Sequence, residues 1–450
     1  MPSVFIYLGV MLAVICLWFL LFKRPIYEGV VISFIVLIAL TGTWNRIGVY
    51  FADAMKTSLL YSMVAFVAMS QLLSKTKIID NCVHIIIALL GRIPGGAGYA
   101  SIIASSFMGA LSGSGPGNVM ATGSITIPAM KKTGFPPELA ANVESTSSYL
   151  GNMIPPSANI VAALGAFMAV YPDSNLTTGK FWVICWGISL WFILSRVLQL
   201  FAFCKYYKIK PMAKEDMPNL KVALKEGWTG LLLPVIILAP FIFDSVFNAT
   251  LLTERIGKIG AKYFSSSLLI FVAGIAALYG ILATKKTVNF KSMVNTFSNG
   301  VKGLAPIVST CIFGYAIGAL FEDIKAGEQM QAVFQSMNLG KVGLVLIVPL
   351  ITCFISMVIP GSSIVVMFGA VFINLFASVG VDPLLVAAML PCMCGVMCGI
   401  TPPFALGMYA GMSIAESDFD KTVKNDLWWV AVQYIMEVIV LMGWLPIIGL

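Results

Sequence analysis

The stretch SGSGPGN, residues 112–118, lies inside one of the most apolar regions of the chain, between FMGAL and VMATG. Glycine and proline are poor helix formers, and a broken helix cannot leave unpaired backbone groups facing lipid. The stretch therefore predicts a helix break that is enclosed by protein, where the freed backbone groups can bind a ligand.

The composition indicates an integral membrane protein. Of the 450 residues, 59% are hydrophobic and only 11% are charged, whereas about 25% of the residues of a soluble chain are charged. Apolar runs recur from end to end, so we expect one membrane unit without a sizeable soluble domain. The first run, VFIYLGVMLAVICLWFLLF, precedes Lys23 and Arg24, and we interpret it as a retained spanning helix and not as a signal peptide.

Charge and cysteine content argue against other classes of protein. The formal charge of +8 fits the Lys and Arg excess of cytoplasmic loops, so we expect no nucleic-acid partner. We interpret Cys392, Cys394 and Cys398 of PCMCGVMC as packing residues, with a soft-metal site as the alternative. A membrane enzyme would need clustered His, Asp or Glu, which the sequence does not display, and we expect no catalytic residues.

We predict an all-α polytopic fold with four helix breaks. Regions of about 99–130 and 343–378 each match two short helical legs around a Gly, Ser and Pro break, and we predict re-entrant hairpins there. Helices 138–171 and 383–412 are predicted to break at NMIPPS and GITPPF. The other predicted spans are 3–22, 28–42, 57–74, 180–204, 228–243, 265–283, 303–321 and 427–449.

The breaks recur at a nearly constant spacing in the two halves. Matching positions lie 244 to 247 residues apart, as in Gly117 and Gly361, Pro137 and Pro383, and Pro155 and Pro402. The basic loops predict opposite orientations, with both termini external. We therefore expect two inverted repeats, residues 1–207 and 228–450, joined by a cytoplasmic linker, 208–227. Inverted repeats with matched broken helices are typical of secondary transporters.

The freed carbonyls and neighbouring hydroxyls at the breaks suit a small cation, and we predict two similar cation sites. In the first, Ser112, Ser114 and Asn118 lie opposite Gly151 to Ile154. In the second, Gly361, Ser362 and Ser363 lie opposite Gly399, Ile400 and Thr401. The alternative is that the breaks are only kinks with close packing.

Buried polar side chains near the breaks are the predicted substrate contacts. Glu144 is the main candidate, because an intramembrane carboxylate is often functional. The alternative is a structural carboxylate that is hydrogen-bonded to neighbouring Ser or Thr. Glu437 is interpreted as equally compatible with an interfacial position. The residues assigned to substrate binding are Asn118, Glu144, Asn152, Ser157 and Ser363.

The blocks GALSGSGPGNVMATGSITIPAMKKTGFPPELAANVESTSSYLGNMIPPS and GVDPLLVAAMLPCMCGVMCGITPPFALGMYAG, with IPGSS, resemble the large membrane subunit of tripartite ATP-independent periplasmic (TRAP) transporters. The resemblance covers nearly the whole chain. It implies an elevator-type mechanism in the bacterial inner membrane and sodium-driven uptake of an organic acid delivered by a soluble binding protein. By the resemblance, the sodium ligands would be Ser112, Ser114, Asn118, Gly151 and Pro155 in one site, and Gly361, Ser362, Gly399 and Thr401 in the other.

The resemblance also implies partners. A small four-helix membrane subunit is expected as a separate chain, beside membrane lipid. The hairpin tips depart from the family's pattern, since GSGPGN stands where Ala and Val would lie between Ser and Asn, and VIPGSS stands where Gly-Leu-Pro-Thr is commoner. The alternative function is a stand-alone sodium- or proton-coupled anion symporter of related inverted-repeat fold, which needs no binding protein.

Overall fold

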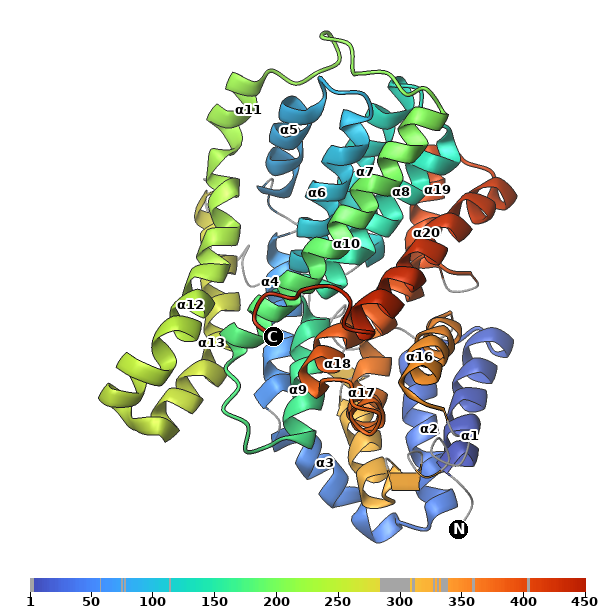
Figure 1. The fold of residues 1–450 in the computed structure, drawn as a ribbon, viewed down its shortest axis with the longest axis vertical. Helices are drawn as coiled ribbons and strands as arrows, with labels where there is room; N and C mark the ends of the chain where they lie inside the picture. Colours follow the sequence, from blue (N-terminus) through green and yellow to red (C-terminus); the bar gives the residue numbers. More distant parts are fainter. Residues whose placement is uncertain are drawn as a thin grey trace.

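The fold of the described residues is all-helical, without strands, as predicted (Figure 1). The computed structural model describes residues 4–56, 58–73, 76, 78–112, 115–283, 308–309, 312–326, 328–329, 332, 339–357, 361–402 and 405–450. The predicted span 303–321 lies partly outside these residues.

The chain begins with short helices, of which α1, α2 and α3 lie at one end of the molecule and α5 lies near the other end (Figure 1). Helix α2 starts directly after Pro25 and ends at Gly42, which has a φ of 70° and so takes the left-handed conformation that glycine tolerates best. The helices of this part are α1 (Val4–Cys16) with a π-helical extension (Leu17–Leu21), α2 (Ile26–Thr41), α3 (Ile47–Lys56), α4 (Ser58–Leu73) and α5 (Ile78–Leu90).

The first predicted hairpin and the first broken helix follow. Two residues separate the hairpin legs, and Gly134, with a φ of 95°, turns the chain into the broken helix. Pro137 opens that helix at its first position, where a missing backbone N–H costs nothing. The elements are α6 (Gly96–Ser112), α7 (Gly115–Lys132), α8 (Pro137–Leu150), a short 3-10 turn η3 (Gly151–Met153) and α9 (Ala158–Val170).

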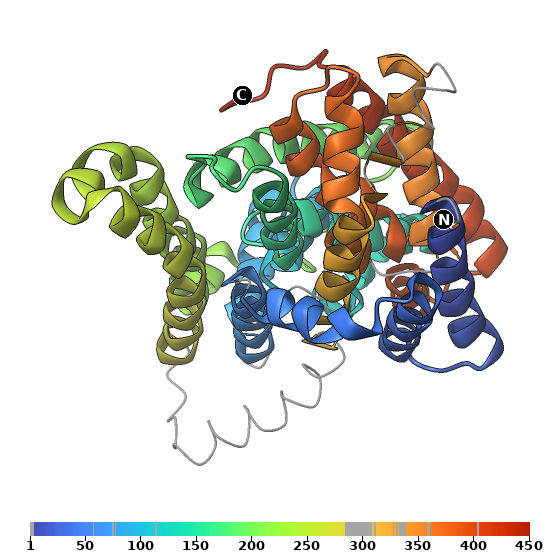
Figure 2. The same cartoon turned by 90° about the horizontal axis from the view of Figure 1, so that it is seen from below.

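A long helix, Thr178–Tyr206, and the helices that follow it connect the two halves. Part of the predicted linker, 208–227, is the helix α11, and the helical stretch Leu220–Asp244 runs from it into the predicted span 228–243. Helices α12 and α13 lie to one side of the other helices (Figure 1, Figure 2). The elements are α10 (Thr178–Tyr206), α11 (Leu220–Gly227), η4 (Trp228–Leu232), α12 (Leu233–Phe247), η5 (Asn248–Leu252) and α13 (Thr253–Ala283).

The second half repeats the order of hairpin and broken helix. Helices α16, α17 and α18 begin 245, 246 and 246 residues after α6, α7 and α8. The opposite orientation of the two halves stays a prediction. The elements are α16 (Lys341–Ser356), α17 (Gly361–Ala377), α18 (Pro383–Leu390), a π-helical turn η6 (Pro391–Val396), a 3-10 turn η7 (Met397–Gly399) and α19 (Leu406–Ala415).

The last helix, α20, differs from the predicted span 427–449, because it covers Phe419–Leu441. The Asp418 carboxylate accepts a hydrogen bond from the Lys421 amide and caps the start of the helix. Gly443, with a φ of 78°, and Pro446 follow the end of the helix, and neither favours its continuation. The prediction was wrong by about two turns because the apolar run extends beyond the helix.

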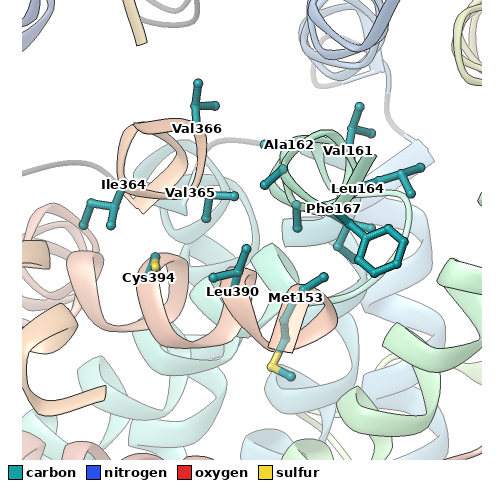
Figure 3. Close-up of a cluster of buried hydrophobic side chains, with 14 of the residues drawn as sticks. Met153, Val161, Ala162, Leu164, Phe167, Ile364, Val365, Val366, Leu390 and Cys394 are labelled. Atoms are coloured by element: carbon teal, nitrogen blue, oxygen red, sulfur yellow. The ribbon is translucent and has the colours of Figure 1, made fainter. Parts of the chain in front are cut away.

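The two halves interleave in the core. Helix α9 of the first broken helix packs on α17 of the second hairpin, while α19 packs on α7 and α8. Figure 3 shows the first of these contacts, where Ala162 on α9 faces Val365 on α17. Each broken helix is therefore held by the hairpin of the other half.

Three helical stretches of the described residues are long and apolar enough to cross a bilayer, or up to four if a bent pair in α13 counts as one: Pro137–Val170, Thr178–Tyr206 and Leu220–Asp244. The exposed face of α10 is apolar, since Leu190, Leu194, Leu198 and Phe201 are 45% to 59% exposed. An apolar stripe of this length on the outside of the molecule is typical of a membrane protein.

Candidate functional site

The tips of both hairpins are only partly described. Helix α6 ends at Ser112 and α7 begins at Gly115, and the side chain of Ser112 and all of Gly113 and Ser114 lie outside the described residues. Residues 358–360, before α17, also lie outside them. The candidate site is therefore built from the residues that flank the tips.

Asn118 lies close behind the first tip, in the first turn of α7. It is 1% exposed, and its amide nitrogen donates hydrogen bonds to the Ser105 carbonyl and the Ser148 hydroxyl, both at 2.8 Å. Its Oδ1 atom has no hydrogen-bond partner among the residues that the structure describes. A buried side-chain oxygen without a donor is suited to bind a cation.

Glu144 joins the first hairpin to the first broken helix. Its carboxylate is fully buried and accepts hydrogen bonds from five hydroxyl groups on three helices, at 2.5 to 3.1 Å. The donors are Ser101 and Ser105 on α6, Thr122 and Thr126 on α7, and Ser148 on α8. Five donors are enough to saturate both carboxylate oxygens. This geometry matches the alternative of a structural carboxylate more closely than a direct substrate contact.

The first break brings several candidate ligands together, but most of its carbonyls are already in use. The Pro155 carbonyl accepts no hydrogen bond from the described residues, which leaves it available to a cation. Gly151 keeps a second lone pair. The occupied carbonyls are those of Gly151, which accepts from the Ile154 amide at 3.1 Å, of Ile154, which accepts from the Ser157 amide at 3.1 Å, and of Met153, which accepts from the Ser189 hydroxyl at 2.7 Å.

The polar side chains of this break also have structural contacts. Asn152 donates to the Gly395 carbonyl in the second broken helix at 2.8 Å. Ser157 caps α9 by accepting from the Asn159 amide at 3.2 Å. Both side chains therefore hold the break in place, whatever else they bind.

The second break is tied in a similar way. The Thr401 hydroxyl donates to the Met397 carbonyl at 2.7 Å, and the Thr401 carbonyl accepts from the Ala405 amide at 3.2 Å. The hydroxyl oxygen keeps its acceptor capacity and can still bind a cation. Pro403 and Phe404 lie outside the described residues.

The start of α17 lies directly on the second break. A Cβ atom on Gly361 would lie 2.3 Å from the Cys394 carbonyl oxygen, so the two backbones are in contact. Ser362 is half-buried, while Ser363 is 1% exposed and its hydroxyl has no hydrogen-bond partner in the described part of the chain. In the second half, the Ser363 hydroxyl corresponds to Asn118 Oδ1 in the first half.

Tyr149 connects the elements of the two predicted cation sites. Its ring fills the space in front of three glycines, where a Cβ atom would lie within 2.3 Å of a ring carbon: Gly115 at the first tip, and Gly399 and Gly407 around the second break. The structure therefore brings the first tip and the second break against one side chain.

The sequence interpretation missed a second buried polar group. Arg196 on α10 is 1% exposed and donates to Gln433 on α20, while Asp426 and Glu437 on α20 are 2% and 0% exposed. The Glu437 side chain, for which the sequence left an interfacial position open, is enclosed between helices. An Arg inside the predicted span 180–204 was the available signal, since a charge within a span is a functional candidate.

Comparison with known proteins identifies the family. The model of the tripartite ATP-independent periplasmic transporter DctM component matches residues 6–448. The C4-dicarboxylate TRAP transporter large permease protein DctM of Vibrio cholerae is 27% identical over 86% of this chain and 86% of its own length. The sialic acid TRAP transporter large permease protein SiaM of the same organism is 22% identical, covering 80% of this chain and 79% of that protein.

A solved structure supports the fold. The YdaH transporter of Alcanivorax borkumensis superimposes with a TM-score of 0.62 at 17% sequence identity, covering 90% of this chain and 88% of that chain. The chain belongs to the family of DctM components of tripartite ATP-independent periplasmic transporters, which are membrane permeases and not enzymes.

Proposed function

We propose that this permease imports an organic acid that carries a carboxylate, with sodium as the coupling ion. The observation that carries the proposal is the pair of hairpins packed on two broken helices, each with an unpaired buried oxygen, Asn118 Oδ1 and Ser363 Oγ. Broken helices that face each other in this way are the usual binding elements of secondary transporters.

Sodium is proposed to bind at the two breaks. The first site is formed by Ser112, Ser114, Asn118, Gly151 and Pro155, and the second by Gly361, Ser362, Gly399 and Thr401. Oxygen ligands from carbonyls, hydroxyls and an amide suit a hard cation. The unused acceptors at Asn118 and Pro155 favour the first site.

The substrate is proposed to lie next to these sites, near Asn118, Asn152, Ser157 and Ser363. Glu144 stays a predicted substrate contact, although its five hydroxyl donors favour an anchoring role. The relatives named for C4-dicarboxylates and for sialic acid both transport carboxylates, which supports the organic-acid class.

Transport is proposed to follow an elevator-type movement in the bacterial inner membrane. Because α9 packs on α17, and α19 on α7 and α8, the hairpins and broken helices form one interleaved unit that can move as a body. The proposed partners are a small four-helix membrane subunit and a periplasmic binding protein that delivers the acid.

Reconstitution in liposomes tests this assignment. With an inward sodium gradient, uptake of labelled succinate or sialic acid is expected only when the small subunit and the matching binding protein are present. Uptake by this chain alone would instead support a stand-alone symporter. Uptake that is unchanged when potassium replaces sodium would contradict sodium coupling.

Asn118→Ala is expected to raise the sodium concentration needed for half-maximal thermal stabilisation of the purified chain about tenfold, because roughly 1.4 kcal/mol of ligand interaction is lost. Ser124→Ala is the control, since it lies at an exposed position of the same helix, where its hydroxyl donates to the Ala121 carbonyl. Equal sodium requirements in both variants would show that Oδ1 is not a sodium ligand.

A further inference from the structure

A buried group of ionisable side chains joins α10, α20 and the second broken helix. It includes none of the predicted sodium or substrate ligands. Every member is at most 2% exposed, although a charge enclosed among apolar helices is costly unless it is compensated. The members of this charged cluster are Arg196 on α10, Asp426, Gln433 and Glu437 on α20, and Cys392 on η6.

Hydrogen bonds link the charged cluster from one helix to the next. Arg196 donates to the Gln433 side-chain oxygen at 2.9 Å and to the Trp429 carbonyl at 3.2 Å. The Gln433 amide nitrogen donates to Glu437 Oε1 at 3.1 Å and to the Cys392 sulfur at 2.9 Å. The Cys392 thiol lies 3.5 Å from the same Glu437 oxygen. A change in the charge of Glu437 therefore acts directly on η6, through the contact with Cys392.

The two carboxyl groups are poorly compensated if both are ionised. Among the described residues, Asp426 Oδ1 and Glu437 Oε2 have no hydrogen-bond partner, and neither has Arg196 Nε. Within the described part of the chain, no ion pair of 4 Å or less joins Arg196 to either carboxyl group. One cation faces two acids, so the ionised cluster would carry a net negative charge in a low-dielectric interior.

We propose that the charged cluster is a proton-binding site, which holds one proton on either Asp426 or Glu437. With that proton the cluster is neutral, and a protonated carboxyl group gains an O–H donor.

The one lysine of α16, Lys341, is bound further along α20, since its Nζ donates to the Met442 carbonyl at 3.2 Å. Helix α18 carries no titratable residue, and the Glu144 carboxylate on α8 is bound by hydroxyls of α6, α7 and α8 itself. Thiols and phenols are ordinarily neutral near pH 7. The titratable neighbours that interact with Glu437 are Cys353 on α16, Cys392 and Cys394 on η6, and Tyr434 on α20.

The proposal fixes the sign of a pH dependence. In the unfolded chain both carboxyl groups lose their protons near pH 4, whereas the folded chain keeps one proton at higher pH. The folded state then binds more protons, so its stability falls as the pH rises above about 4 until the cluster releases its proton.

Thermal unfolding of the purified full-length chain in detergent, from about pH 5 to about pH 9, tests this proposal. In Glu437→Gln and in Asp426→Asn, one carboxylate remains to balance the charge of Arg196. The cluster of each variant is therefore neutral without a bound proton. In each variant, the unfolding midpoint is expected to fall with rising pH much less than in the wild type. If only one variant flattens the profile, the proton resides on that carboxyl group. The control Glu215→Gln, at an exposed position, is expected to keep the wild-type slope.

Two further variants test the charge balance itself. Arg196→Gln leaves two acids without a cation and is expected to steepen the pH dependence. The double variant Glu437→Gln with Asp426→Asn leaves Arg196 unbalanced and is expected to lower the midpoint at every pH. Wild-type slopes in both single variants would overturn the proposal. If Arg196→Gln fails to fold, the infrared band of a protonated carboxyl group is measured in the two single variants. Loss of the band in one or both variants supports the proposal, and its retention in both contradicts it.

Discussion

Gly151→Ala is expected to destabilise the fold by about 3 kcal/mol or more, because the position has no room for a side chain. A Cβ atom there would lie 2.4 Å from both the Ala110 nitrogen and the Gly109 carbonyl carbon. These are backbone atoms of α6, which cannot turn away as a flexible side chain can. The first break and the first hairpin would therefore have to separate.

Gly274→Ala is the matched control for this variant. Gly274 lies inside α13 and has nothing within 4 Å of its Cβ position, so alanine is expected to stabilise the helix by up to about 1 kcal/mol. The two purified variants are compared by thermal unfolding in detergent. Equal midpoints would show that the contact between Gly151 and α6 is not part of the native packing.

The helix breaks could be predicted because glycine and proline act locally. The hairpin predicted at 99–130 is observed as Gly96–Ser112 and Gly115–Lys132, and the broken helix predicted at 383–412 begins at Pro383. Proline removes a backbone donor wherever it stands, and the effect does not depend on the rest of the fold. The end of α20 was less predictable, since the hydrophobic run continues past Gly443.

The contacts of the candidate site depend on tertiary packing and could not be predicted. Nothing near Tyr149 in the sequence indicates that its ring fills the space before Gly399 and Gly407, more than 240 residues away. Most of the carbonyls expected to be free before Pro155 are bonded. Those of Gly151 and Ile154 accept from nearby amides, and that of Met153 accepts from the hydroxyl of Ser189 on α10. A local pattern shows which groups are released by a break but not which partners capture them.

Glu144 illustrates the same limit and gives the second large expected effect. Glu144→Ala is expected to destabilise the fold by about 3 to 5 kcal/mol, since removing a buried charged acceptor strands its donors. Thr122 and Thr126 can turn to the backbone carbonyls of Asn118 and Thr122, at 2.8 and 3.1 Å. Among the described residues, Ser101 and the Ser148 hydroxyl proton have no other acceptor.

Glu144→Gln separates the hydrogen-bonding role from the charge. Glutamine keeps one acceptor oxygen, and the hydroxyls can rotate to accept from its amide, so a loss of only about 1 kcal/mol is expected. The control Glu226→Ala, at an exposed position of α11, is expected to change the unfolding midpoint little. If Glu144→Ala were as stable as that control but did not support uptake, the result would favour Glu144 as a substrate contact. If Glu144 anchors the hairpin, Glu144→Ala should also weaken sodium binding, because Ser105 and Ser148 hold both the carboxylate and the Asn118 amide.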